Sequence, residues 1–283
     1  MRRIPLLVVL ACVVVALPVI AAPGGLAGAT ANPNGIAFRI PQTDQHIYLA
    51  TRNQDPGVVL MIDGAEEKLA YMRPANNLSA FTIGTAIDAA TATQFPHLLF
   101  FYYCNGFAEK SIWRAPETKQ WTDTNIVRSV AFTPDQFLCY SVSPGGGKDG
   151  RILVLAPAPR MPGPPGSGAP EPRLLANTRY VVKLAQVGGA WGGHFAFDRD
   201  GKLYISNGDV AGAAIWRCPE DGTPPVKVFQ GKGPILGFTF ANRNTVLFTD
   251  GGTQLWRAKL GAADATVEFT SPKGNRYCGV LVK

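Results

Sequence analysis

The feature that most constrains the fold of this chain is a short tryptophan-containing segment that occurs three times. It reads SIWRAPE at 111–117, AIWRCPE at 214–220 and QLWRAKL at 254–260. Trp216 and Trp256 are about 40 residues apart, and Trp113 precedes Leu153 of the related segment GRILVLAP by the same interval, a spacing typical of stacked or radial repeats. We therefore expect one supersecondary unit to recur along most of the chain.

Each unit contains four short apolar or alternating segments that are rich in Val, Ile, Phe and Tyr and are bounded by Gly, Pro, Asn and Asp. The first segment of successive units reads GIAFRI, SAFTIG, SVAFTP, HFAFDR and LGFTFAN, and a last copy, CGVLVK, stands at the C-terminus. The fourth segment of the second unit is the least distinct and is expected near TNIV at 124–127. No long segment keeps a helical period of 3.6 residues. Four antiparallel strands repeated around an axis describe an all-β fold, the β-propeller.

The number of blades follows from these repeats only in part. Five full units of four strands are followed by a lone C-terminal strand, so the ring is either five-bladed or an incomplete six-bladed one. An unfinished blade would leave a sheet edge open to a protein partner or a second copy. The repeated tryptophans are expected to fill the space between neighbouring blades, because large aromatic side chains contribute most to such packing.

The N-terminal sequence MRRIPLLVVLACVVVALPVIAA has two arginines before an apolar run and small residues after it. This pattern predicts a signal peptide over 1–31, with cleavage near Ala29-Thr30-Ala31. The alternative is a retained membrane anchor, since the run approaches the length that spans a bilayer. With cleavage, residues 32–283 form a single secreted or periplasmic propeller domain that is not bound to a membrane. A Pro/Gly-rich loop at 156–172 and a helical turn within 85–97 interrupt it.

Charge and cysteine content narrow the function classes. The net charge of +7 comes from singly scattered Lys and Arg residues, whereas nucleic-acid binding requires a basic stripe, so we expect no nucleic-acid partner. No P-loop is present, and we expect no nucleotide. The cysteines that follow the leader allow three disulfide pairings or four buried thiols, and the sequence does not choose between them. They are Cys104, Cys139, Cys218 and Cys278.

A ligand site is expected at one end of the central axis. Strands alternate in direction, so the starts of first strands and the ends of second strands lie on the same face, and polar residues there converge on a small polar ligand. The residues expected to bind that ligand are Asn77, Asn105, Arg128, Asn207, Arg276 and Tyr277. His194 opens a first strand, and its ordinary pKa makes it the candidate proton carrier.

The stretch NPNGIAFRIPQTDQHIYLAT at 32–51 resembles the repeat of the gluconolactonase and senescence-marker family, which grades into NHL-type propellers. The resemblance implies that Asn34 helps to hold a divalent cation (calcium, manganese or zinc) above the central channel. Asp209 and Asp250 are the other expected metal ligands. In this catalytic interpretation the cation polarises a lactone carbonyl, while His194 and Asp209 assist proton transfer to and from the attacking water. The early Glu motif of the family has no counterpart in this sequence.

A second stretch, WGGHFAFDRDGKLYISNGD at 191–209, resembles the repeat of soluble quinoprotein sugar dehydrogenases. Those enzymes have a catalytic His where this chain has Ala190, which argues against a PQQ cofactor because the general base is missing. Three functions therefore stay open: a sugar- or lactone-binding propeller with metal-dependent hydrolysis, a non-catalytic recognition propeller, and a degenerate relative of the quinoprotein dehydrogenases.

Overall fold

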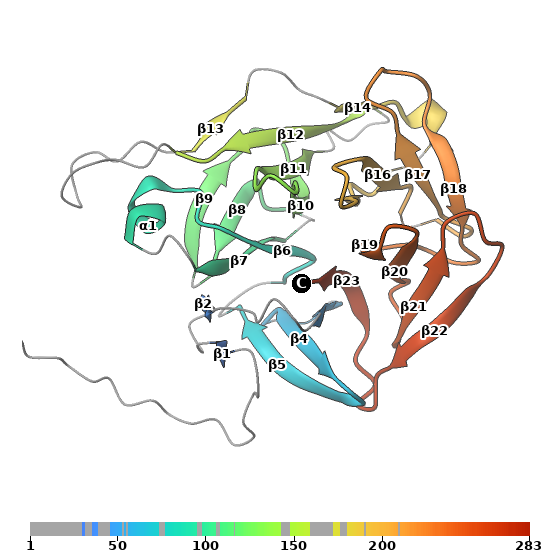
Figure 1. Cartoon of the computed structure of the whole chain (residues 1–283), viewed down its shortest axis with the longest axis horizontal. Coiled ribbons are helices and arrows are strands. Elements are labelled where there is room, and N and C mark those ends of the chain that lie inside the picture. The colour runs from blue at the N-terminus through green and yellow to red at the C-terminus, as the bar shows by residue number, and fades with distance from the viewer. Residues whose placement is uncertain are drawn as a thin grey trace, which may run out of the picture.

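The strands of this chain form five antiparallel sheets arranged around a single axis, as the computed structural model in Figure 1 shows. The structure describes residues 30–31, 36–38, 46–52, 54, 56–73, 77–94, 98–105, 108–115, 117–142, 148–158, 172–175, 180–189, 191–208 and 210–283. Of the leader predicted over 1–31, only Thr30–Ala31 is among these residues, and most of the predicted loop at 156–172 also lies outside them. Among the described residues, no helix has the length and apolar character needed to cross a membrane.

Each sheet is one blade, and its strands are named here from the axis outward. Blade 1 contains β23 (Tyr277–Val282), β3 (Ile47–Thr51), β4 (Val58–Asp63) and β5 (Glu66–Met72). Blade 2 contains β6 (Ala80–Gly84), β7 (Leu99–Cys104), β8 (Ser111–Arg114) and β9 (Thr118–Thr122). Blade 3 contains β10 (Val127–Phe132), β11 (Leu138–Val142), β12 (Gly150–Ala156) and β13 (Arg173–Leu174), and β14 (Tyr180–Val182) also pairs with β12.

Blade 4 contains β15 (Phe195–Phe197), β16 (Leu203–Ser206), β17 (Ala214–Cys218) and β18 (Val226–Gln230). Blade 5 contains β19 (Gly237–Asn242), β20 (Thr245–Thr249), β21 (Gln254–Lys259) and β22 (Ala265–Thr270). The predicted all-β propeller of four-stranded blades is confirmed. The fourth strand of blade 2 differs from its expected place, because it is Thr118–Thr122 and not the stretch near 124–127.

The C-terminal strand closes the ring. β23 pairs with β3 along most of its length, with Val280 opposite Leu49, and so becomes the innermost strand of blade 1. The sequence pattern predicts GIAFRI there, but β2 (Ile36–Phe38) pairs at Ile36 and Ala37 with the first residues of β7, and β1 (Thr30–Ala31) pairs with β2. A sheet edge accepts only one strand, and β23 offers the longer register. The ring is therefore five-bladed, and the blade that the repeat count left unfinished is complete.

The three tryptophan segments occupy equivalent positions, as the repeat predicted. Trp113, Trp216 and Trp256 lie on the third strands β8, β17 and β21, and in each strand a β-bulge immediately precedes the tryptophan. A bulge turns the following side chain relative to the sheet. All three tryptophans are half-buried and pack on the hydrophobic cores between blades.

The hydrophobic core is divided into five clusters, one between each pair of neighbouring blades. Tyr71 and Phe101 stack between blades 1 and 2, with their ring centroids 5.8 Å apart. Leu49 and Leu247 meet between blades 1 and 5. Because each sheet buries both of its faces against neighbours, the ring stabilises itself without a covering layer of helices.

Two smaller expectations concern the insertion and the cysteines. The helical turn predicted within 85–97 is α1 (Ala89–Gln94), and the Asp88 carboxylate accepts a hydrogen bond from the Thr91 N–H at 2.9 Å. A 3₁₀ turn, η1, covers Leu184–Gln186.

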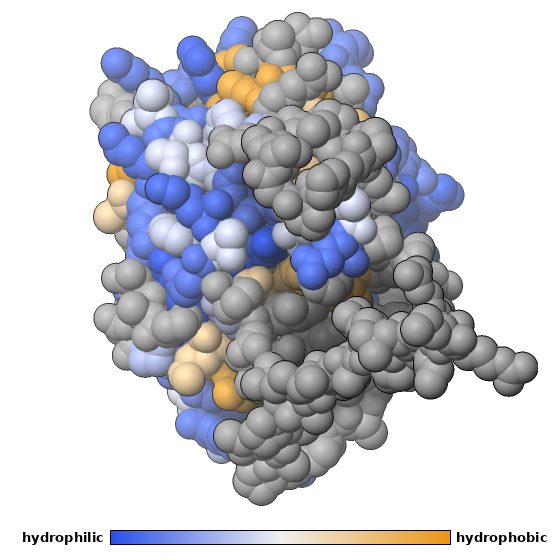
Figure 2. All heavy atoms as spheres, turned by 90° about the vertical axis from the view of Figure 1, so that its left-hand side faces the viewer, coloured by the Kyte–Doolittle hydropathy of each residue, from blue (hydrophilic) through white to orange (hydrophobic). Residues whose placement is uncertain are grey.

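The four described cysteines are thiols and form no disulfide. The coloured residues on the side of the molecule seen in Figure 2 are mainly hydrophilic, with small separate apolar patches.

Candidate functional site

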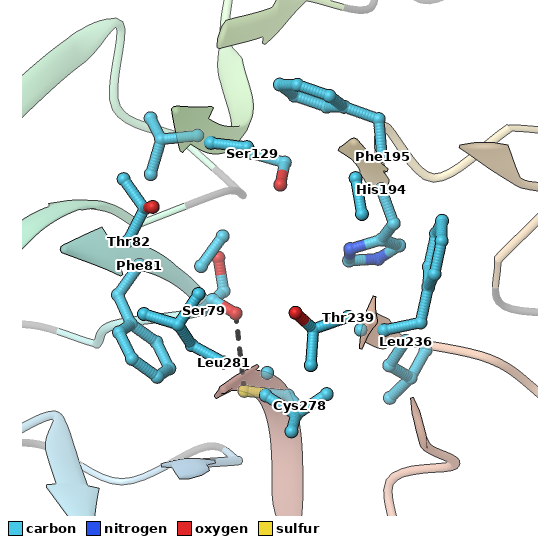
Figure 3. A pocket seen from close by; sticks show the side chains of 18 of the residues that line it. Ser79, Phe81, Thr82, Ser129, His194, Phe195, Leu236, Thr239, Cys278 and Leu281 are labelled. Carbon is cyan, nitrogen blue, oxygen red and sulfur yellow. Dashed lines mark hydrogen bonds between the residues drawn. The ribbon is translucent and has the colours of Figure 1, made fainter. Parts of the chain in front are cut away.

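A narrow channel runs along the propeller axis between the five innermost strands. Its volume is about 100 Å³, and since an ordered water needs about 10–15 Å³ of such space, the channel holds several waters or one edge of a small polar molecule. At one end of the channel, the side chains that line it belong to the first residue of each aligned inner-strand segment. We call them the mouth ring, which consists of Ser79, Ser129, His194, Leu236 and Cys278 (Figure 3).

The hydroxyl groups that line this channel lack protein partners. Ser79 is only 8% exposed, and its Oγ has no hydrogen-bond partner. The hydroxyls of Ser129, Thr82 and Thr239 form no hydrogen bond with any described residue, and all three residues line the same channel. A buried hydroxyl without a partner costs about 1–3 kcal/mol, so such groups are normally satisfied by water or by a ligand. The channel therefore presents several hydrogen-bonding groups to whatever occupies it.

His194 is fixed at the start of β15 by hydrogen bonds to its backbone. Its carbonyl oxygen accepts bonds from the Ser206 N–H and from Trp191 Nε1, both at 3.2 Å. Two glycines lie beside the ring: a Cβ added to Gly192 would be 3.1 Å from His194 Cδ2, and Gly208, with φ +78°, approaches the same atom. In Figure 3 the imidazole points into the channel.

The surroundings of His194 keep its ring neutral. Burial and, to a smaller extent, the positive charge of Arg128 together lower the pKa of His194 to about 4. Arg128 stands next to the mouth ring, because a Cβ added to Gly193 would lie 2.2 Å from the Arg128 Cβ. At pH 7 the imidazole is therefore uncharged, and it can donate one hydrogen bond and accept another.

Two further arginines lie at the mouth between blades 1 and 5, and both contact Gly251. Arg276 Nε donates a hydrogen bond to the Gly251 carbonyl oxygen at 2.8 Å. Arg52 packs on the same glycine, since a Cβ added there would lie 2.1 Å from Arg52 Nη1. Burial raises the pKa of the Cys278 thiol to about 12, and the charge of Arg52 partly opposes this shift. The Arg52 charge therefore acts on the channel lining.

Four other predicted site residues hold the loops at the mouth. Asp250 Oδ1 accepts a bond from the Gly252 N–H at 2.8 Å, and Asp250 Oδ2 accepts one from Trp256 Nε1 at 3.1 Å. Asn207 Oδ1 accepts a bond from the Ala214 N–H at 2.6 Å. The side chain of Asn105 also accepts a bond, at Oδ1 from the Ala108 N–H. Asn77 differs from these, because its backbone carbonyl oxygen accepts the bond, from Nη1 of the buried Arg73.

Tyr277 was predicted to bind the ligand, but the structure places it elsewhere. Its side chain is fully buried in the cluster between blades 1 and 5, and its hydroxyl donates a hydrogen bond to Glu67. Burial raises the pKa of Tyr277 well above its usual value. The register of β23 shifts between Tyr277 and Gly279, so the ring faces the neighbouring blade and Cys278 lines the channel.

Of the predicted metal ligands, Asn34 and Asp209 lie outside the described residues, as does Ala190. Asp250 is the one member of the predicted set that is described. In the described part of the chain, no three His, Cys, Asp or Glu residues are grouped as metal ligands. The divalent cation stays a prediction.

Sequence reasoning missed most of the channel lining. Besides His194, the polar side chains of the lining are Ser79, Thr82, Ser129, Thr239 and Cys278. The signal was present in the aligned segments SAFTIG, SVAFTP, HFAFDR, LGFTFA and CGVLVK, since the first letter of each is a member of the mouth ring. Most of the predicted ligand-binding residues are instead polar residues that flank the strands.

Comparison with known proteins agrees with the fold. No protein-family model and no curated protein matches this sequence. Among solved structures, a chain from a nidogen/laminin complex is 14% identical with a TM-score of 0.51, and the match covers 84% of this chain and 98% of that one. A gluconolactonase from Xanthomonas campestris is 11% identical with a TM-score of 0.43 over 92% and 91% of the two chains. An oxidoreductase from Thermus thermophilus, described as a glucose dehydrogenase, is 13% identical with a TM-score of 0.40 over 77% and 80%. At 14% identity the likeness to the nidogen/laminin chain concerns the fold alone.

Proposed function

We propose that this protein is a secreted or periplasmic β-propeller that binds a small polyhydroxylated ligand, a sugar or a sugar lactone, at its axial mouth. The observation that supports the proposal most directly is the mouth ring, in which the partnerless Ser79 hydroxyl shares the channel with Ser129 and the neutral His194 imidazole. Hydroxyls and a neutral imidazole both donate and accept hydrogen bonds, as the hydroxyls of a sugar do.

The size of the channel limits how such a ligand is held. A volume of about 100 Å³ is too small to enclose a hexose, since ligand pockets that enclose their ligand are about 300–1,000 Å³. The ligand would insert one edge among the channel hydroxyls and leave the remainder at the mouth. Displacement of water from Ser79 and Ser129 by ligand hydroxyls would preserve their hydrogen bonds.

Binding is tested by isothermal titration calorimetry of the protein with glucose, gluconolactone and gluconate. Replacement of channel hydroxyls by Ser129→Ala or Thr239→Val should weaken binding by about threefold to tenfold each, because one hydrogen bond is lost. Thr266→Val, which removes a hydroxyl from the exposed strand β22, is the matched control and should leave the affinity unchanged. If the unmodified protein binds none of the three compounds, the proposed function is wrong.

Hydrolysis of a bound lactone is the second candidate, and the neutral His194 ring favours it because it can accept a proton at pH 7. A pKa of about 4 nevertheless makes this imidazole a weak base, and base catalysis falls with base strength. For this reason we place binding before turnover. A cation held by Asn34 with Asp209 or Asp250 would supply polarisation of the lactone carbonyl.

The catalytic version is tested by gluconolactone hydrolysis with calcium, manganese or zinc and after chelation, together with the melting temperature under each condition. A metal that binds the folded protein raises its melting temperature. Metal-stimulated hydrolysis that His194→Gln abolishes would support the lactonase. Ligand binding without turnover under every condition would identify a recognition propeller.

A further inference from the structure

The charge at the mouth of the channel is positive where blades 1 and 5 meet. Arg128 stands at blade 3, beside His194, and Arg52 and Arg276 converge on Gly251 at the junction of blades 1 and 5. Among the described residues, no carboxylate forms an ion pair with Arg52 or Arg276. Two guanidinium groups held on one glycine without such a partner repel each other, and a bound anion would remove this repulsion.

The channel lining adds no negative charge to this field. Its described residues include no Asp and no Glu. Its two titratable side chains, His194 and Cys278, interact with the charges of Arg128 and Arg52 respectively, and among the described residues no carboxylate acts on either. The described carboxylate at the mouth, Asp250, has both oxygens bonded to Gly252 and Trp256.

We propose that the ligand of this site is a polyhydroxy carboxylate, such as a sugar acid, whose carboxylate contacts the arginines at the mouth and whose hydroxyl groups enter the channel. This inference rests on the proposed binding function and names its ligand class. A guanidinium group binds a carboxylate through two parallel hydrogen bonds, which gives orientation as well as affinity. The Ser79, Ser129 and His194 groups then select for a hydroxylated chain over a simple anion.

The experiment compares gluconate with glucose, which share a hydroxylated six-carbon skeleton but differ in charge, and with inorganic phosphate, which carries charge without that chain. Calorimetry should show gluconate binding at least tenfold more tightly than either. A hydrogen bond to a charged group contributes about 1.5–3 kcal/mol, so Arg52→Gln and Arg276→Gln should each reduce gluconate affinity at least tenfold and leave glucose affinity unchanged. Arg217→Gln, which removes the same charge from the exposed part of β17, is the control and should change neither.

Salt dependence gives a readout that does not depend on the folding of a variant. Gluconate affinity should fall as sodium chloride rises from about 20 to about 500 mM, in line with the change in screening length, and glucose affinity should not. Equal affinities for glucose and gluconate, or a stronger affinity for glucose, would overturn the inference and leave the sugar-binding function standing. Phosphate binding as tight as gluconate would overturn it in favour of a general anion site. Binding of none of the compounds would remove both proposals.

Discussion

At the scale of single residues, the half-buried His194 and the fully buried Arg73 show how the surroundings of a basic side chain decide its charge. His194 has an arginine as its charged neighbour and stays neutral. Arg73 is 1% exposed at its side chain but contacts two carboxylates, Glu109 at 2.9 Å and Glu117 at 3.1 Å, and lies over the rings of Tyr103 and Trp113. A buried charge requires such partners, since an isolated one is very costly. The neutral His194 is therefore suited to the ligand site, and the charged Arg73 to the interface between blades 1 and 2.

The lowered pKa of His194 predicts a loss of stability in acid. Between pH 6.5 and about 4 this histidine binds a proton in the unfolded chain but not in the folded protein, so stability should fall as the pH falls through that window. His194→Gln should therefore lose less melting temperature between pH 7 and pH 4 than the unmodified protein does. NMR titration of the His194 ring gives the same answer directly, and a midpoint near 6.5 would contradict it.

Removal of Arg73 should destabilise the junction of blades 1 and 2. Arg73→Met leaves the partly exposed carboxylates of Glu109 and Glu117 without their shared partner, and loss of a hydrogen bond between charged groups costs about 1.5–3 kcal/mol. Urea denaturation measures the difference in unfolding free energy. Lys232→Met is the matched control, because Lys232 pairs with Asp264 while 90% exposed, and it should have no measurable effect. Similar stabilities for the two variants would show that the Arg73 contacts contribute little.

At the scale of elements, the β-bulge and the terminal strand set the geometry of the blades. The bulges before Trp113, Trp216 and Trp256 give three blades the same turn toward their neighbours. β23 places three buried side chains, Tyr277, Cys278 and Val280, at the inner edge of blade 1. The terminal strand is therefore as important to the ring as any internal one.

Truncation of the chain after Arg276 tests this role of β23. Without the strand, β3 has an open edge and the core between blades 1 and 5 is exposed, so we expect loss of the cooperative thermal transition and a tendency to aggregate. Removal of Lys283 alone, which follows β23, should keep a cooperative transition. Circular dichroism during heating distinguishes the two results, and an unchanged transition in the longer truncation would contradict the closure.

At the scale of the whole molecule, the ring has no independent part, since every blade shares a core with both of its neighbours. The axial channel exists only while all five inner strands are in place, because each contributes to its lining. Binding at the axis should therefore be lost together with the fold, in one step.

Substitutions in two different interfaces should accordingly shift one common transition. Leu49→Ala, between blades 1 and 5, and Leu138→Ala, between blades 2 and 3, each create a cavity at a fully buried site and should cost about 2–5 kcal/mol. Val267→Ala on the exposed face of β22 should change stability little. Circular dichroism and tryptophan fluorescence should report the same midpoint for each protein, and separate midpoints would show blades that unfold independently.

The sequence by itself determined most of the strands, the repeat and the equivalent positions of the tryptophans, because alternation of apolar residues and turn chemistry are local properties. It also placed His194, Arg128 and Arg276 at one end of the axis. Only the tertiary structure decided that β23 and not GIAFRI completes blade 1, that Tyr277 turns into the core, and that Ser79 and Ser129 face the channel. These outcomes depend on competition between strands more than 200 residues apart and on packing between sheets, and neither is encoded in any short stretch of the chain.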